Sequence, residues 1–135
     1  LSACLVALKK CQELLSTEMN RLSEIKRSFL EGIKGRMPGV LVNTPADGIP
    51  GFISLSFPGC SGHEIVAALS LSGLSISTGS ACHANEVEPP RIIMALGRSR
   101  QEAKGTIRIS MGYGNTQEAA EQLLAAITEY INIKT

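Results

Sequence analysis

Apolar residues recur every three or four positions through the first part of the chain, with lysine, arginine and glutamate between them. The stripe consists of Leu8, Cys11, Leu15, Met19, Leu22, Ile25, Phe29 and Ile33. This spacing predicts one long amphipathic helix over residues 5–34, ended by Gly35 and the Pro38-Gly39 pair. At ~1.5 Å per residue the helix would reach ~45 Å, beyond the ~30 Å diameter of a small domain. We therefore expect part of it to extend past the domain body or to meet another surface.

Shorter strand-like and helix-like patterns alternate after this helix. Apolar or alternating runs bounded by turn residues predict strands at 40–42, 52–57, 74–77 and 106–110. Helical spacing predicts a helix capped by Ser61 and ending near Gly73, short helices at 92–96 and 99–104, and a closing helix capped by Asn115 or Thr116. In the closing helix, the buried stripe is predicted to be Ala119, Leu123, Ala126, Ile127 and Tyr130, and Glu118 would complete a capping box with Asn115. This order of elements predicts an α+β two-layer sandwich: a small, mainly antiparallel sheet with helices on one face, preceded by the long helix.

Arg108 lies in the middle of the predicted strand 106–110. Side chains alternate along a strand, so Ile107 and Ile109 are expected to face the core and Arg108 the opposite, open face. On such a face an arginine is commonly a solvated charge or a salt-bridge partner. A guanidinium mounted on a rigid strand is equally suited to bind a carboxylate through two hydrogen bonds.

The composition is that of one globular domain, with 135 residues, 44% hydrophobic and 19% charged. A net charge of +1 gives no strong positive field, so we expect neither a nucleic acid nor a membrane surface as partner. No apolar run approaches the ~20 residues that span a bilayer. Four cysteines at wide, irregular gaps indicate reduced thiols and hence a cytoplasmic protein. Because the sequence starts at Leu1 within a helical pattern, we expect it to be a piece of a longer chain.

Cys82 is the cysteine best suited to chemistry. It follows a predicted strand, among small residues that leave a thiol accessible, and the adjacent His83 favours the thiolate form. The alternative for Cys82 is a small buried residue. Cys4 and Cys11 lie one heptad apart on the long helix, where we expect them to pack as small hydrophobes.

A zinc site is a weaker possibility. Cys60 and His63, together with Cys82 and His83, offer four ligands of the right types, although two separate loops would have to meet. We favour instead an exposed position for His63, in the first turn of the helix that follows Ser61. The glycine-rich stretch 112–115 lacks the spacing of a phosphate-binding loop and predicts a turn.

Several motifs occur in a fixed order: residues 76–82 (ISTGSAC), Glu88-Pro89, residues 95–97 (ALG) and residues 105–110 (GTIRIS). Together they resemble the carboxy-terminal region of the cysteine desulfurases, which are class V aminotransferases, and the stretch from Cys82 to Pro89 resembles the long loop of the first group of these enzymes. The resemblance implies the small domain of a fold-type I aminotransferase. It also implies that Cys82 attacks the sulfur of L-cysteine and becomes a persulfide, and that Arg108 holds the substrate carboxylate.

The resemblance further implies a larger parent enzyme. The family's pyridoxal phosphate is bound by a lysine in a Ser-x-His-Lys context, within a large amino-terminal domain, and no lysine here has that context. We therefore expect residues 1–36 to be a connecting helix, residues 37–135 to be the small domain, and the chain alone to be inactive without a cofactor site of its own. Implied partners are L-cysteine, a sulfur acceptor or iron–sulfur scaffold protein, and a second copy of the full-length enzyme. Selenocysteine lyase and a non-enzymatic sulfur-carrier or adaptor module are the alternatives. Residues 52–54 replace a stretch in which relatives often carry asparagine.

Overall fold

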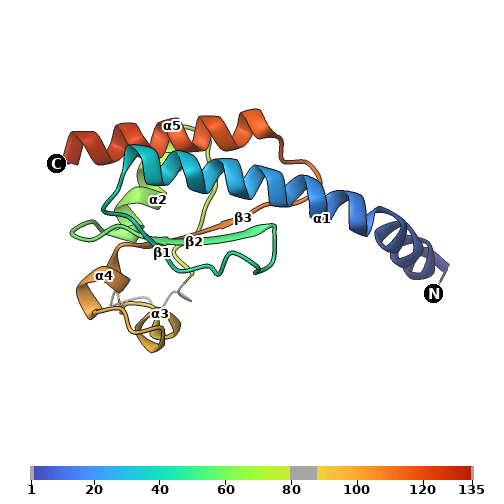
Figure 1. Cartoon of the computed structure of the whole chain (residues 1–135), viewed down its shortest axis with the longest axis horizontal. Helices are drawn as coiled ribbons and strands as arrows, with labels where there is room; N and C mark the ends of the chain where they lie inside the picture. Colours follow the sequence, from blue (N-terminus) through green and yellow to red (C-terminus); the bar gives the residue numbers. More distant parts are fainter. Residues whose placement is uncertain (1, 80–87, 135) are drawn as a thin grey trace.

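The computed structural model describes residues 2–79 and 88–134. Its longest element is helix α1, Ser2–Arg36, which confirms the predicted amphipathic helix (Figure 1). Only the second half of α1 packs on the domain body, through Leu22, Ile25, Phe29 and Ile33. In the first half, Leu8 is 64% exposed and Leu15 59% exposed. The expected overhang is therefore present.

Three antiparallel strands form the sheet, in the order β1 (Leu41–Val42), β2 (Phe52–Ser56) and β3 (Thr106–Ser110). Its register places Leu41 opposite Ser56, and Leu55 opposite Ile107. Four isoleucine and leucine side chains of β2 and β3 are almost fully buried in the main core: Ile53, Leu55, Ile107 and Ile109. Since side chains alternate across a strand, the residues between them point to the other face of the sheet. We call that face, formed by Ser54, Ser56, Thr106 and Arg108, the polar face.

Helices lie on both sides of the sheet (Figure 1). The apolar face is covered by α1, by α2 (Gly62–Leu71) and by α5 (Gln117–Lys134), which supply the rest of the main core. Two short helices, α3 (Arg91–Ala95) and α4 (Arg100–Lys104), lie on the opposite side of the sheet. The predicted sandwich, with its principal helices on one face, is thus confirmed. Among the described helices, none has a stretch long and apolar enough to cross a membrane.

The predicted strand at 74–77 is wrong. The amide of Leu74 donates to the carbonyl of Leu69 and so belongs to the end of α2, where Gly73 adopts a φ of +76°. Only Ser77 pairs with the sheet, through an isolated bridge to Arg108. The helix end therefore already uses the amide of Leu74, which a strand beginning at this residue would need.

The helix starts follow local chemistry that the sequence predicted in part. Ser99 and Glu102 form a complete capping box at α4, whereas Ser61 precedes α2 without a side-chain cap. At α5 the Thr116 hydroxyl accepts a hydrogen bond from the amide of Ala119 at 3.3 Å. Asn115 instead accepts from the amide of Gly112 at 2.7 Å within the predicted turn, so the expected Asn115–Glu118 capping box is wrong. The buried face of α5 consists of Ala120, Leu123, Leu124 and Ile127.

Candidate functional site

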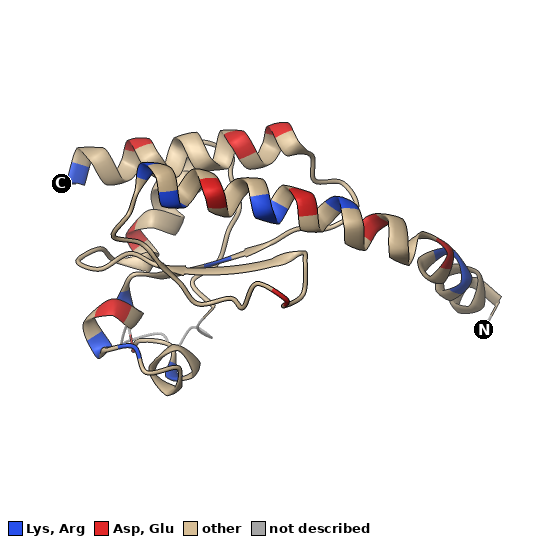
Figure 2. Cartoon of the chain, in the orientation of Figure 1, with Lys and Arg blue, Asp and Glu red and all other residues tan. Residues whose placement is uncertain are grey.

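Arg108 is the one charged residue in the three described strands. Charged residues otherwise gather on the helices, as Figure 2 shows for α1, α4 and α5. Its side chain lies on the polar face, as the alternation predicted, but that face is not open. Ser54, Ser56 and Thr106 are only 7%, 0% and 3% exposed. The expectation of a solvated strand face is therefore corrected: α3, α4 and their connections cover this side of the sheet.

The backbone of Arg108 is fixed from the side away from β2. Its amide and carbonyl pair with the carbonyl and amide of Ser77, at 2.5 and 3.0 Å. The Ser77 hydroxyl accepts a hydrogen bond from the amide of Gly79 at 3.1 Å, and Gly79 has a φ of +75°. A Cβ atom on Gly79 would lie 3.7 Å from the Cβ of Arg108, so this turn runs directly beside the arginine stem. The turn thus restricts where the guanidinium can lie.

The guanidinium of Arg108 has no acceptor within the described part of the chain. Its Nε is buried and lacks a hydrogen-bond partner. The two ion pairs among the described residues, Arg21–Glu18 and Lys134–Glu64, both lie elsewhere. A buried donor on a cation is costly when left unpaired. This arrangement is suited to an anionic group that comes from outside these residues.

A chain of hydrogen bonds crosses the polar face next to Arg108. The hydroxyls of Ser56 and Thr106 are 2.7 Å apart, and the Asn43 side-chain amide donates to Ser56 at 2.8 Å. Arg98 donates through Nε to the side-chain oxygen of Asn43 at 3.0 Å. This network joins the connection between α3 and α4 to the edge of the sheet. This network was not predicted from the sequence, although the serines that alternate with apolar residues in β2 were a visible signal.

The catalytic candidate Cys82 lies outside the described residues, together with His83. Its proposed role as a nucleophile therefore stays a prediction. The described residue Ser77 lies five positions before Cys82 in the sequence and is bonded to Arg108 through the backbone.

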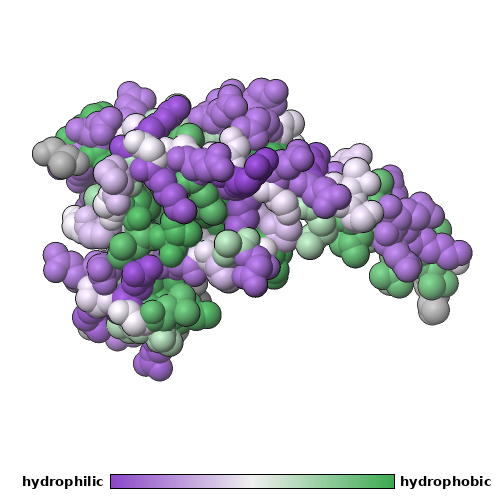
Figure 3. Space-filling view, in the orientation of Figure 1, coloured by the Kyte–Doolittle hydropathy of each residue, from purple (hydrophilic) through white to green (hydrophobic). Residues whose placement is uncertain are grey.

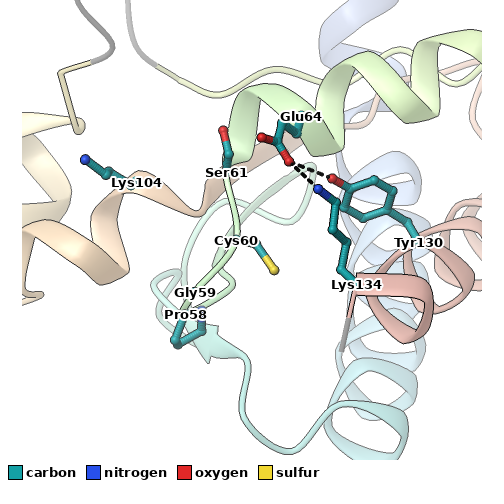
Figure 4. A pocket seen from close by; sticks show the side chains of 8 residues that line it. All are labelled: Pro58, Gly59, Cys60, Ser61, Glu64, Lys104, Tyr130 and Lys134. Carbon is teal, nitrogen blue, oxygen red and sulfur yellow. Dashed lines mark hydrogen bonds and ion pairs between the residues drawn. The ribbon is translucent and has the colours of Figure 1, made fainter.

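The zinc alternative gains no support. His63 is exposed on α2, as expected, and the described residues contain no cluster of three or more potential metal ligands. Cys60 instead lines a pocket of about 670 Å³ (Figure 4). The other residues of this pocket are Pro58, Gly59, Ser61, Glu64, Lys104, Tyr130 and Lys134.

The polar groups of this pocket bond to one another. Lys134 donates to the Glu64 carboxylate at 2.8 Å and the Tyr130 hydroxyl donates to the same oxygen at 3.3 Å. The hydrogen bond from Lys134 lowers the pKa of Glu64. Burial raises the pKa of the Cys60 thiol, a change that the nearby Lys134 opposes. A thiol with a raised pKa is a poor nucleophile at neutral pH, so Cys60 is not a strong competitor for the role assigned to Cys82.

The expectation for the remaining cysteines is wrong. Cys4 and Cys11 are both exposed, because they lie on the half of α1 that extends beyond the domain body. Exposed apolar residues gather at this end of α1 and also over α3, where Ile92 is 71% exposed (Figure 3).

The lysines of the chain do not suit a cofactor that is bound through an imine. Lys26, the one lysine buried in the described residues, is held by the carbonyl oxygens of Pro45, Gly48 and Ile49 at 3.3–3.4 Å. Lys134 is paired with Glu64, and Lys9 and Lys10 lie on the exposed overhang. Lys34 and Lys104 are exposed as well, so no lysine among the described residues is both buried and free of a partner.

Comparison with known proteins identifies the family and the fold. The sequence profile described as Aminotransferase class-V matches residues 2–123. The chain belongs to the class-V aminotransferase family. Among solved structures, this class-V aminotransferase chain resembles a NifS-like protein with a TM-score of 0.79 and 26% identity, over 94% of this chain and 32% of that one. The small-domain fold is therefore confirmed.

Curated relatives of this class-V chain include the cysteine desulfurase IscS of Clostridium botulinum, 30% identical over 93% of this chain and 32% of the relative. The cysteine desulfurase IscS of Dictyoglomus turgidum is 31% identical over 87% of this chain and 30% of the relative. The chain thus spans about a third of the length of these curated relatives.

Proposed function

We propose that this chain is the small domain of a cysteine desulfurase. Arg108 binds the carboxylate of L-cysteine, and Cys82 accepts the sulfur atom and delivers it to an acceptor for iron–sulfur cluster or thio-compound synthesis. The observation that carries the proposal is the buried Arg108 Nε, which has no partner among residues 2–79 and 88–134, on a strand face that holds no other charged side chain. The matches to cysteine desulfurases along almost the whole chain support it.

The cofactor belongs, in this proposal, to the part of the enzyme outside this sequence. Pyridoxal phosphate would supply an electron sink there. The contribution of Arg108 is to fix the substrate by two parallel hydrogen bonds to its carboxylate. Because Ser77 and Gly79 hold the arginine stem, the substrate would be oriented at a defined distance from the strand.

The contribution of Cys82 is nucleophilic. Its thiolate forms a bond to the sulfur of L-cysteine, while the bond between that sulfur and the β carbon breaks. The electron pair of the broken bond stays with the substrate carbon, which takes up a proton to give L-alanine. The sulfur remains on Cys82 as a persulfide, and a second thiol of an acceptor protein can then remove it.

The test uses the full-length protein that contains this chain. Cys82→Ser should abolish alanine formation from L-cysteine, because an alcohol is a much poorer nucleophile than a thiolate at neutral pH. Cys60→Ser is the matched control and should keep the parental rate. Mass spectrometry of peptides after a short incubation with L-cysteine should place the additional sulfur on Cys82. Alanine formation at the parental rate by Cys82→Ser, or a persulfide on Cys60, would refute the proposal.

A further inference from the structure

Ser54 is the direct neighbour of Arg108 across β2 and β3. The two residues are opposite each other in the antiparallel register. The backbone of Ser54 bonds towards β1: its amide donates to the Thr44 hydroxyl at 2.6 Å, and its carbonyl accepts from the amide of Asn43 at 2.9 Å. The backbone of Arg108 bonds to Ser77 on the other side. Ser54 and Arg108 thus form a non-hydrogen-bonded pair, the type in which facing side chains come closest.

The hydroxyl of Ser54 has no bonding partner in the part of the chain that the structure describes, although the residue is only 7% exposed. Ser56, two positions along the same strand and on the same face, provides the contrast. Its hydroxyl bonds to both Asn43 and Thr106. Arg108 Nε is the one fully buried side-chain donor without a partner among the described residues. The Ser54 hydroxyl faces it across the strand pair, is not fully enclosed, and has no acceptor of its own within the described part of the chain, so it is free to bond to the same incoming group.

We infer that Ser54 is a second binding residue for the carboxylate that Arg108 holds, an inference that rests on the proposed function. A carboxylate can accept about four hydrogen bonds, and a guanidinium that binds through two parallel bonds uses only two of them. The Ser54 hydroxyl donates to a remaining lone pair from the β2 side of Arg108. Ser54 thereby sets the affinity for the carboxylate and its orientation against the sheet.

Ligand binding to the full-length holoenzyme tests this inference without relying on turnover. The probe is L-alanine, the expected product, and its matched probe is L-alaninol, which carries a hydroxymethyl group in place of the carboxylate. Calorimetric titration should show that Ser54→Ala weakens L-alanine binding about tenfold, as expected for one hydrogen bond to a charged group. The binding of L-alaninol should not change. Ser54→Thr keeps the hydroxyl and should restore L-alanine binding to within about twofold.

Ser110→Ala is the control variant, since Ser110 lies on the same face of β3 and is exposed. It should bind both probes as the parent does. Unchanged L-alanine binding by Ser54→Ala would overturn the inference, and so would an equal loss for L-alaninol, which would make Ser54 a structural residue. Arg108→Lys separates the two proposals. If Arg108→Lys weakens L-alanine binding and Ser54→Ala does not, only the role of Ser54 is refuted. If Arg108→Lys has no effect, or if the parent enzyme does not bind L-alanine, the result counts against the proposed function itself.

Discussion

Ser77 and Arg108 exchange both of their backbone hydrogen bonds, at 3.0 and 2.5 Å, although Ser77 belongs to no strand. This single bridge adds a short edge to the sheet at the point where Arg108 faces the polar side. Ser77 then orients the turn at Gly79 through its hydroxyl. The bridge consequently couples the position of Arg108 to the turn formed by Ser77 and Gly79.

Arg108→Lys should reduce kcat/KM for L-cysteine in the full-length enzyme. A lysine keeps the charge but loses the planar pair of donors that matches a carboxylate. The expected loss is about 2 to 4 kcal/mol of transition-state stabilisation, as for a desolvated charge pair. Arg100→Lys, at an exposed position of α4, is the matched control and should leave the rate unchanged. An unaltered kcat/KM for Arg108→Lys would return Arg108 to the role of an ordinary strand charge.

Lys26→Met should destabilise the domain. The Lys26 ammonium is 4% exposed and holds three carbonyl groups of the loop between β1 and β2, at 3.3–3.4 Å. Methionine fills similar space but leaves these acceptors unpaired, which costs about 1–3 kcal/mol. Urea unfolding followed by circular dichroism measures the change. Lys34→Met, an exposed position on the same helix, should have little effect, and equal midpoints for the two variants would show that the loop does not depend on Lys26.

The alternation of polar and apolar residues was sufficient to predict the two faces of the sheet. In β3, residues 106–110 were predicted with their observed bounds, and Arg108 was assigned to the face opposite Ile107 and Ile109. This succeeds because side-chain direction in a strand depends only on local geometry. Burial of the polar face could not be predicted in the same way. It depends on α3 and α4, which follow β2 by more than thirty positions in the sequence.

The polar network shows the same limit of local reasoning. Arg98 bonds to Asn43, a residue 55 positions away, and no short-range pattern connects them. The failed strand at 74–77 has a different cause. Its alternating residues suit a strand, but Leu74 is already bonded to the end of α2. The positions of Cys4 and Cys11 depend on how much of α1 the domain body covers, which periodicity along a helix does not determine.

Cys60 should react more slowly with iodoacetamide than Cys4 or Cys11 at pH 8. Its thiol is partly buried and its pKa is raised by that burial, so less thiolate is present. Timed alkylation followed by peptide mass spectrometry gives the order of the three rates. Equal alkylation rates for the three thiols would contradict the assignment.

The raised pKa of Cys60 also means that the folded state holds the thiol proton more tightly than the unfolded state. The free energy of unfolding should therefore fall as the pH rises through the ordinary thiol range towards the higher folded pKa. Cys60→Ala should remove that part of the decline.

The isolated chain of 135 residues should associate in solution through the overhang of α1. Leu8, Leu15 and Leu22 follow one another at heptad spacing and therefore share one face of the helix. Leu22 packs against the core and is only 9% exposed, whereas Leu8 and Leu15 are 64% and 59% exposed. The same apolar stripe is therefore covered at one end of the helix and solvent-exposed at the other. Exposed apolar patches favour association.

Sedimentation velocity of the isolated chain at micromolar concentration should detect dimers or larger species. The double variant Leu8→Gln and Leu15→Gln should shift the chain to a monomer, while Gln12→Ala, which retains both leucines, should not. A parent chain that stays monomeric at this concentration would show that the exposed stripe is too weak to hold two copies together.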